Sequence, residues 1–124
     1  LFIFDFDETL SVRSSYLPIQ ELALHVDRID LASMDERYVH GHRCWSRRMT
    51  ELHQRLAEQG ISTEKLLETF RAIELSPGTA ELFRDIRAQH HRIIVLSNAC
   101  DLVVEECLRA HHLLDCVEKI ESNP

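Results

Sequence analysis

Two aspartates, Asp5 and Asp7, directly follow an apolar run at the start of the sequence, in the stretch LFIFDFDETL. An ionised carboxylate costs several kcal/mol when it is buried without compensation, so charge is unexpected inside a buried strand. Residues two apart on an extended chain point to the same side, which lets both carboxylates approach one small ligand. We therefore expect Leu1 to Phe4 to be core, and the two aspartates to lie at a strand end where they can bind or react.

A second polar pair, Ser97 and Asn98, follows the apolar stretch IIVL. In open parallel sheets, ligands bind beyond the carboxyl ends of the strands. Ser97 is expected to precede a helix, whose first N–H groups and dipole favour an anion. Capping of that helix remains an alternative role for Ser97 and Asn98, and a turn or cap role remains one for the aspartates.

Carboxylates facing an anion site are compatible only if a cation lies between them. Mg²⁺ is the expected cofactor, because it prefers one or two carboxylates together with phosphate oxygens and water. The pattern predicts phosphoryl transfer, in which one aspartate attacks phosphorus and the other exchanges protons with the leaving group and with water. The Ser97 hydroxyl would then offset charge on the phosphoryl oxygens.

The apolar periodicity predicts the elements that position these residues. Five apolar or aromatic residues at helical spacing predict one long helix that ends at Gly60. These residues are Tyr38, Trp45, Met49, Leu52 and Leu56. A second helix is predicted over 63–73, capped by Ser62 or Thr63. A third helix follows the SPG turn, and its buried face is predicted to be Leu82, Phe83 and Ile86.

The strand at 93–96 is followed by a helix with a predicted apolar face of Val103, Val104, Cys107 and Leu108, and then by a third strand within CVEKIES. This order predicts an α/β fold, an open parallel sheet in three layers with a helical insert after the first strand. Residues 1–10 and 77–124 would form the core domain, and residues 11–76 the insert. Glu105 and Glu106 are expected on a solvated helix face.

The composition excludes several classes of partner. The 124 residues carry a net charge of −7 and no Lys/Arg block, so neither nucleic acid nor an anionic membrane is an expected partner. No apolar run reaches the eighteen residues or so that a membrane span needs. The four cysteines have no zinc-site spacing, which predicts reduced thiols in a cytoplasmic protein: Cys44, Cys100, Cys107 and Cys116. The sequence gives no indication of oligomeric state.

Two of these motifs resemble those of haloacid-dehalogenase-like phosphatases. DFDET has the DxDx(T/V) form of the first motif of that family, and IIVLSN is similar to its second motif. The resemblance implies that Asp5 is the nucleophile and Asp7 the general acid and base, with Ser97 and Asn98 at the phosphate. It also implies that the Asp5 carboxylate and the Asp7 backbone carbonyl bind Mg²⁺, and that the helical insert is a cap over the substrate.

The order of further segments resembles the phosphoethanolamine/phosphocholine phosphatase branch over nearly the whole chain: LAEQGIS, ELSPGTAEL, HHLLDC and IESNP. A small phosphorylated metabolite is therefore the implied substrate. Two positions depart from that branch, which commonly has Asp where Tyr16 and Asn98 stand here. Those departures matter because an ammonium head group is held by a carboxylate or an aromatic cage.

The third and fourth motifs of the family, a lysine and an acidic pair, are not recognisable. The two lysines, Lys65 and Lys119, stand in other contexts. We therefore expect the chain to be cut from a longer protein before those motifs. The alternative function is a truncated or degenerate phosphatase-like domain that binds phosphate ligands or partners without turnover.

Overall fold

The computed structural model describes residues 1–26, 29–40 and 44–123, and the chain forms two compact units. The sheet unit consists of Leu1–Pro18 and Leu67–Pro124, and the helical unit of Ile19–Leu66. The stretches that flank the helical unit hydrogen-bond to each other within the sheet unit, where Val12 N–H donates to the Glu74 carbonyl at 3.0 Å. The boundaries of the helical unit therefore lie inside the predicted insert 11–76. That this insert acts as a cap stays a prediction.

The sheet unit contains a parallel sheet of three strands in the order β1-β2-β3: β1 (Phe2–Phe4), β2 (Ile93–Cys100) and β3 (Lys119–Asn123). Helix α5 (Thr79–Ala88) precedes β2, and α6 (Asp101–Ala110) with the short turn η2 (Leu114–Cys116) connects β2 to β3. Parallel neighbours require such crossovers, because a tight turn can join only antiparallel strands. The predicted α/β class, parallel sheet and element order are confirmed.

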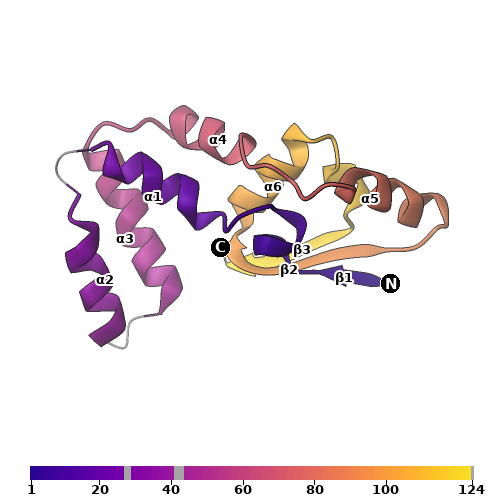
Figure 1. Cartoon of the computed structure of the whole chain (residues 1–124), viewed down its shortest axis with the longest axis horizontal. Helices are drawn as coiled ribbons and strands as arrows, with labels where there is room; N and C mark the ends of the chain where they lie inside the picture. Colours follow the sequence, from indigo (N-terminus) through magenta and orange to yellow (C-terminus); the bar gives the residue numbers. More distant parts are fainter. Residues whose placement is uncertain (27–28, 41–43, 124) are drawn as a thin grey trace. The chain divides into compact units, whose positions relative to one another are not determined.

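Both helices cover the same face of the sheet (Figure 1). On that face the ring of Phe4 lies 5.4 Å from the ring of Phe83 in α5, and Ile93 and Val95 are fully buried. The predicted apolar face of α6 is confirmed, because all four residues are buried: Val103, Val104, Cys107 and Leu108.

The predicted buried face of α5 is wrong at Leu82, which is 45% exposed, whereas Phe83 and Ile86 are buried. The buried residues of α5 are Thr79, Phe83 and Ile86, and this face is centred between Phe83 and Ile86. Leu82 lies at its margin, about 100° from Phe83 around the helix axis and on the far side of Ile86.

The predicted burial of Leu1 to Phe4 is also wrong. Leu1, Phe2 and Ile3 are 63%, 40% and 59% exposed, and Phe4 is half-buried. The reason is the position of β1, which is an edge strand among the described strands instead of a central one. Apolar character identified the strand correctly, but it did not reveal how many neighbours the strand has.

The helical unit is built from α1 (Tyr16–Leu24), α2 (Leu31–His40), α3 (Trp45–Glu58) and α4 (Thr63–Arg71), the first and last of which extend into the sheet unit. The single long helix predicted from Tyr38 to Leu56 is wrong, because α2 ends and α3 begins within that span. The side chain of Tyr38 lies outside the described residues. Leu52 and Leu56 are fully buried as predicted, whereas Trp45 and Met49 are half-buried.

The predicted ends of these helices are close to the observed ones. Gly60, with a φ of 84°, follows the end of α3, and the Ser62 hydroxyl accepts a hydrogen bond from Lys65 N–H at 3.2 Å at the start of α4. Across α2 and α3, the buried Arg48 donates from Nε to the Asp35 carboxylate at 2.9 Å. No helix within the described ranges is long and apolar enough to span a membrane.

Candidate functional site

The carboxyl end of β1 leads into the turn η1 (Phe6–Leu10), with Asp5 directly before this turn and Asp7 within it. The Asp5 carboxylate accepts a hydrogen bond from Phe6 N–H at 2.7 Å, so Asp5 caps this turn. Phe6 is fully buried between the exposed Asp5 and the half-buried Asp7. Glu8 has a φ of 57°, a left-handed conformation that is uncommon for residues other than glycine. A buried aromatic anchor thus fixes a sharp turn with a carboxylate on either side of it.

Two buried serines hold this turn in place. Ser15 N–H donates to the Asp7 carboxylate at 2.7 Å. The Ser11 hydroxyl accepts from Glu8 N–H at 3.3 Å and lies within hydrogen-bonding distance of the carbonyls of Phe6, at 3.0 Å, and Arg13, at 2.8 Å. The sequence analysis assigned no role to either serine. Nothing in a run of small polar residues indicates which hydroxyl is buried.

The second predicted pair lies beside this turn. The parallel register pairs Phe4 with Val95, and η1 contacts β2, so the aspartates that follow β1 lie beside the carboxyl-terminal half of β2, which contains Ser97 and Asn98. Ser97 is half-buried and its hydroxyl accepts from Ala99 N–H at 3.1 Å, while Asn98 is exposed. The structure therefore brings the two motifs together, as the sequence predicted.

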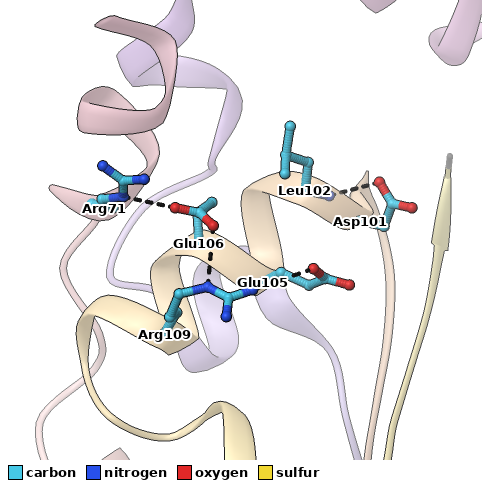
Figure 2. Close-up of polar contacts among 6 residues, drawn as sticks. All are labelled: Arg71, Asp101, Leu102, Glu105, Glu106 and Arg109. Carbon is cyan, nitrogen blue, oxygen red and sulfur yellow. Dashed lines mark hydrogen bonds and ion pairs between the residues drawn. The ribbon is translucent and has the colours of Figure 1, made fainter. Parts of the chain in front are cut away.

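The helix expected after Ser97 is confirmed as α6, but the capping alternative for Ser97 and Asn98 is wrong. The strand continues to Cys100, with an irregular register after Leu96, and Cys100 is the N-cap residue of α6. At the start of α6, the Asp101 carboxylate accepts from Leu102 N–H at 2.6 Å (Figure 2). The helix thus begins four residues after Ser97, because the residues between them remain extended.

The predicted solvated face of α6 is wrong at Glu106, which is only 7% exposed. Figure 2 shows its carboxylate between two arginines, with Arg71 Nε at 2.7 Å and Arg109 Nε at 3.2 Å. The hydrogen bond from Arg71 is the main reason that the pKa of Glu106 lies below its usual range. Arg71 lies 35 positions earlier in the sequence, so local helical spacing could not reveal the pair. Glu105 is half-exposed, and Arg109 Nη2 approaches it only to 3.8 Å.

Cys107 of α6 and His111, the residue that follows this helix, contact the segment after α4. The Cys107 thiol donates to the Ile73 carbonyl at 3.5 Å, and His111 Nε2 lies 2.9 Å from the same oxygen. Burial raises the pKa of Cys107 to about 12, so its thiol stays protonated. All four cysteines are free, as predicted.

No group of three or more His, Cys, Asp or Glu side chains in the described part of the chain could hold a metal ion. The aspartate turn nevertheless has the donor type that Mg²⁺ requires, since this ion is commonly held by only one or two protein carboxylates. Phe6 N–H and Ser15 N–H donate to Oδ1 of Asp5 and to Oδ1 of Asp7, respectively. The residues present therefore fit an ion whose remaining ligands are water and substrate oxygens.

A cavity of about 350 Å³ lies between the two stretches that flank the helical unit. Its lining consists of Val12, Arg13, Ser14, Pro18, Ala72, Ile73 and Glu74. None of the predicted site residues is among them, so this cavity is separate from the aspartate turn.

Comparison with known proteins identifies the family. The model of the family described as Putative Phosphatase matches residues 1–124. The human phosphoethanolamine/phosphocholine phosphatase is 34% identical over 128 aligned residues, which cover all of this chain and 46% of that protein. The chain thus spans about half the length of this curated relative.

Solved structures show the same fold at low sequence identity. A protein from Clostridium difficile described as a Putative Phosphatase matches 98% of this chain and 60% of its own length, with a TM-score of 0.63 at 14% identity. CbbY from Rhodobacter sphaeroides, solved with xylulose-1,5-bisphosphate, has a TM-score of 0.63 at 18% identity. YfnB from Bacillus subtilis, described as a putative HAD-hydrolase and solved with magnesium, has a TM-score of 0.58 at 16% identity. The chain covers 62% of CbbY and 62% of YfnB. The chain belongs to the Putative Phosphatase family and has a haloacid-dehalogenase-like fold.

Proposed function

We propose that the protein carrying this chain hydrolyses a small phosphomonoester through an aspartyl-phosphate intermediate. The observation that carries the proposal is the position of the aspartate turn beside the carboxyl-terminal half of β2, which contains Ser97, on adjacent parallel strands. This is the edge of an open α/β sheet at which ligands bind. Membership of a phosphatase family supports the same reaction.

In the first step, an oxygen of the Asp5 carboxylate forms a bond to phosphorus while the bond from phosphorus to the leaving oxygen breaks. Asp7 in its protonated form gives its proton to that leaving oxygen. In the second step, water attacks phosphorus and Asp7 takes the proton of that water. The bond from phosphorus to Asp5 then breaks, which releases phosphate and restores both carboxyl groups.

The neighbouring residues have supporting roles. Ser15 N–H holds the Asp7 side chain at 2.7 Å, which fixes the position from which the proton is exchanged. The Ser97 hydroxyl donates to a phosphoryl oxygen, and Asn98 lies beside it. Mg²⁺ held by the Asp5 carboxylate and the Asp7 carbonyl would supply electrostatic stabilisation of the phosphoryl oxygens.

The substrate class follows from the relatives and from two residues of this chain. The human relative is named for phosphoethanolamine and phosphocholine, and CbbY was solved with a sugar bisphosphate. Tyr16 and Asn98 stand where the phosphoethanolamine/phosphocholine phosphatase branch commonly has Asp. We therefore expect a small phosphorylated metabolite, and a weaker preference for ammonium head groups than that branch has.

The test is release of inorganic phosphate with Mg²⁺ from a panel of phosphomonoesters that contains phosphocholine, phosphoethanolamine and sugar phosphates. Asp5→Asn is expected to abolish release, and Asp7→Asn to reduce it by roughly 100-fold or more through loss of proton transfer. Glu8→Gln is the matched control, because it makes the same chemical change at an exposed position of the same turn. A phosphorylated Asp5 peptide in quenched reactions is the expected sign of the intermediate.

Absence of phosphate release from the folded protein with every ester would overturn the proposal and favour the binding domain without turnover. Equal loss of activity in Glu8→Gln and Asp5→Asn would also contradict it. In that case the turn would matter for its shape and not for the chemistry of Asp5.

A further inference from the structure

The segment that returns from α4 to α5 contacts the aspartate turn from a distant part of the sequence. We call residues 72–76 the return segment. Its last residue, Ser76, donates from its N–H to the Leu10 carbonyl at 2.7 Å and from its hydroxyl to the Thr9 carbonyl at 2.9 Å. Thr9 and Leu10 end η1, and the last carbonyls of a helical turn have no partner inside that turn. Ser76 therefore supplies donors that η1 cannot supply itself.

A tight turn at the start of α5 holds Ser76. Thr79 N–H donates to the Ser76 carbonyl at 3.1 Å, and Gly78 has a φ of 86° and a ψ of −7°. Proline at the second position and a glycine with positive φ at the third are typical of a type II turn, here over residues 76–79. Pro77 also restricts the residue before it to extended conformations. The two donors of Ser76 are thus set by α5 and its turn, and not by η1.

The return segment is also attached to α6. The Ile73 carbonyl accepts from the Cys107 thiol at 3.5 Å and lies 2.9 Å from His111 Nε2. Directly before the return segment, Arg71 contacts the buried Glu106 of α6 (Figure 2). Both α5 and α6 cover one face of the sheet (Figure 1). The return segment is therefore a support that is fixed at both of its ends.

The direction of Asp7 depends on contacts from outside η1. Asp7 and Glu8 have non-helical backbone angles within this turn, and the φ of Glu8 is 57°. Residues other than glycine keep such a conformation only where the surrounding structure enforces it. Ser11, whose hydroxyl accepts from Glu8 N–H at 3.3 Å, forms an antiparallel bridge with Leu75, the neighbour of Ser76. The return segment thus supports the turn on both sides of its last residue.

We propose that Ser76 is a positioning residue for Asp7, a proposal that rests on the function proposed above. By holding the Thr9 and Leu10 carbonyls, Ser76 keeps η1 in the shape that directs the Asp7 carboxyl group to the leaving oxygen. Asp5 directly follows β1, so its place is set by the sheet. Loss of the Ser76 hydroxyl therefore impairs proton transfer by Asp7 more than attack by Asp5.

The test compares Ser76→Ala with the native full-length protein on two esters. One is the alkyl phosphate that the native protein hydrolyses best, whose leaving oxygen needs a proton. The other is p-nitrophenyl phosphate, whose leaving group departs as a stable anion and gains little from a general acid. We expect Ser76→Ala to lower kcat/KM about tenfold for the alkyl phosphate and less than about twofold for p-nitrophenyl phosphate. Asp7→Asn should show the same ester preference with a larger loss.

Three further variants separate positioning from a general loss of structure. Ser76→Thr keeps the hydroxyl and should lose less activity on the alkyl phosphate than Ser76→Ala. Ser62→Ala is the matched control, because it also removes a hydrogen-bonded serine hydroxyl, one that accepts from Lys65 N–H at 3.2 Å in the helical unit. It should leave the ratio of the two kcat/KM values unchanged. If Ser76→Ala does not fold, Ser76→Cys replaces it, since a thiol is only a weak donor.

Hydrogen exchange provides a readout that needs no activity. Ser76→Ala should raise exchange in the peptide that contains η1. Unchanged exchange there would overturn the proposal. Equal losses of kcat/KM on both esters would also overturn it and leave the proposed function standing, because a loss of folded protein lowers both values alike. A native protein that hydrolyses none of the esters would overturn the proposed function itself, and the proposal with it.

Discussion

Replacing Glu106 by glutamine tests whether the ion-pair cluster on α6 stabilises the sheet unit. The carboxylate is 7% exposed and accepts from Arg71 and Arg109. A hydrogen bond to a charged group contributes about 1.5–3 kcal/mol when buried, and an exposed ion pair about 0.2–1 kcal/mol. The arginine side chains are 40% and 57% exposed, which screens both contacts. We therefore expect Glu106→Gln to lower the stability of the sheet unit by about 1–2 kcal/mol, which corresponds to roughly a 5- to 30-fold loss of protection against hydrogen exchange.

The assay is hydrogen exchange at pH 7, measured by mass spectrometry on peptides from α6 and from the segment around Arg71. Glu105→Gln is the matched control, since Glu105 is the adjacent residue and its ion pair with Arg109 Nη2 spans 3.8 Å. We expect Glu106→Gln to raise exchange in both peptides and Glu105→Gln to leave it nearly unchanged. Equal effects of the two variants would refute the assignment of Glu106 as a buried partner of Arg71.

The pH dependence of the same experiment follows from the lowered pKa of Glu106. A carboxyl group whose pKa is lower in the folded state stabilises that state above its unfolded pKa, and this contribution disappears as the pH falls through the folded pKa. Glutamine does not titrate. The difference in exchange protection between the native chain and Glu106→Gln should therefore have its largest value at pH 7 and shrink below about pH 4. After correction for intrinsic exchange rates, a constant difference would show that packing, and not charge, is responsible.

Two further predictions concern buried side chains. Leu52→Ala in the helical unit should lower the free energy of unfolding by about 2–5 kcal/mol because Leu52 is fully buried, whereas Leu24→Ala, at a 68% exposed position, should cost less than about 0.5 kcal/mol. Urea unfolding followed by the fluorescence of Trp45 measures both, and equal midpoints would contradict the burial. Iodoacetamide at pH 8 should alkylate the exposed Cys44 well before Cys107, whose pKa is about 12. Peptide mass spectrometry reads both rates, and comparable rates would refute the buried thiol.

Local patterns predicted most of the helices and strands, because the start, end and type of such an element depend mainly on residues close together in the sequence. The apolar run before Asp5, the strand before Ser97, the helix stop at Gly60 and the Ser62 cap all follow from residue type and spacing over a few positions. Two carboxylates after one apolar strand and a hydroxyl after another also predicted that both motifs would meet, because parallel strands end at the same edge of a sheet. The sequence by itself thus determined the fold class and the pair of motifs at the candidate site.

Tertiary structure alone decided burial, pairing and the number of neighbours. Apolar character predicted Leu1 and Ile3 to be core, yet both are exposed because burial depends on which elements lie against β1. The carboxylate of Glu106 has helical spacing typical of a solvated face, yet it is buried against Arg71, 35 positions away. Such contacts are set by how distant segments pack. Packing is a property of the folded chain that no short window of sequence contains.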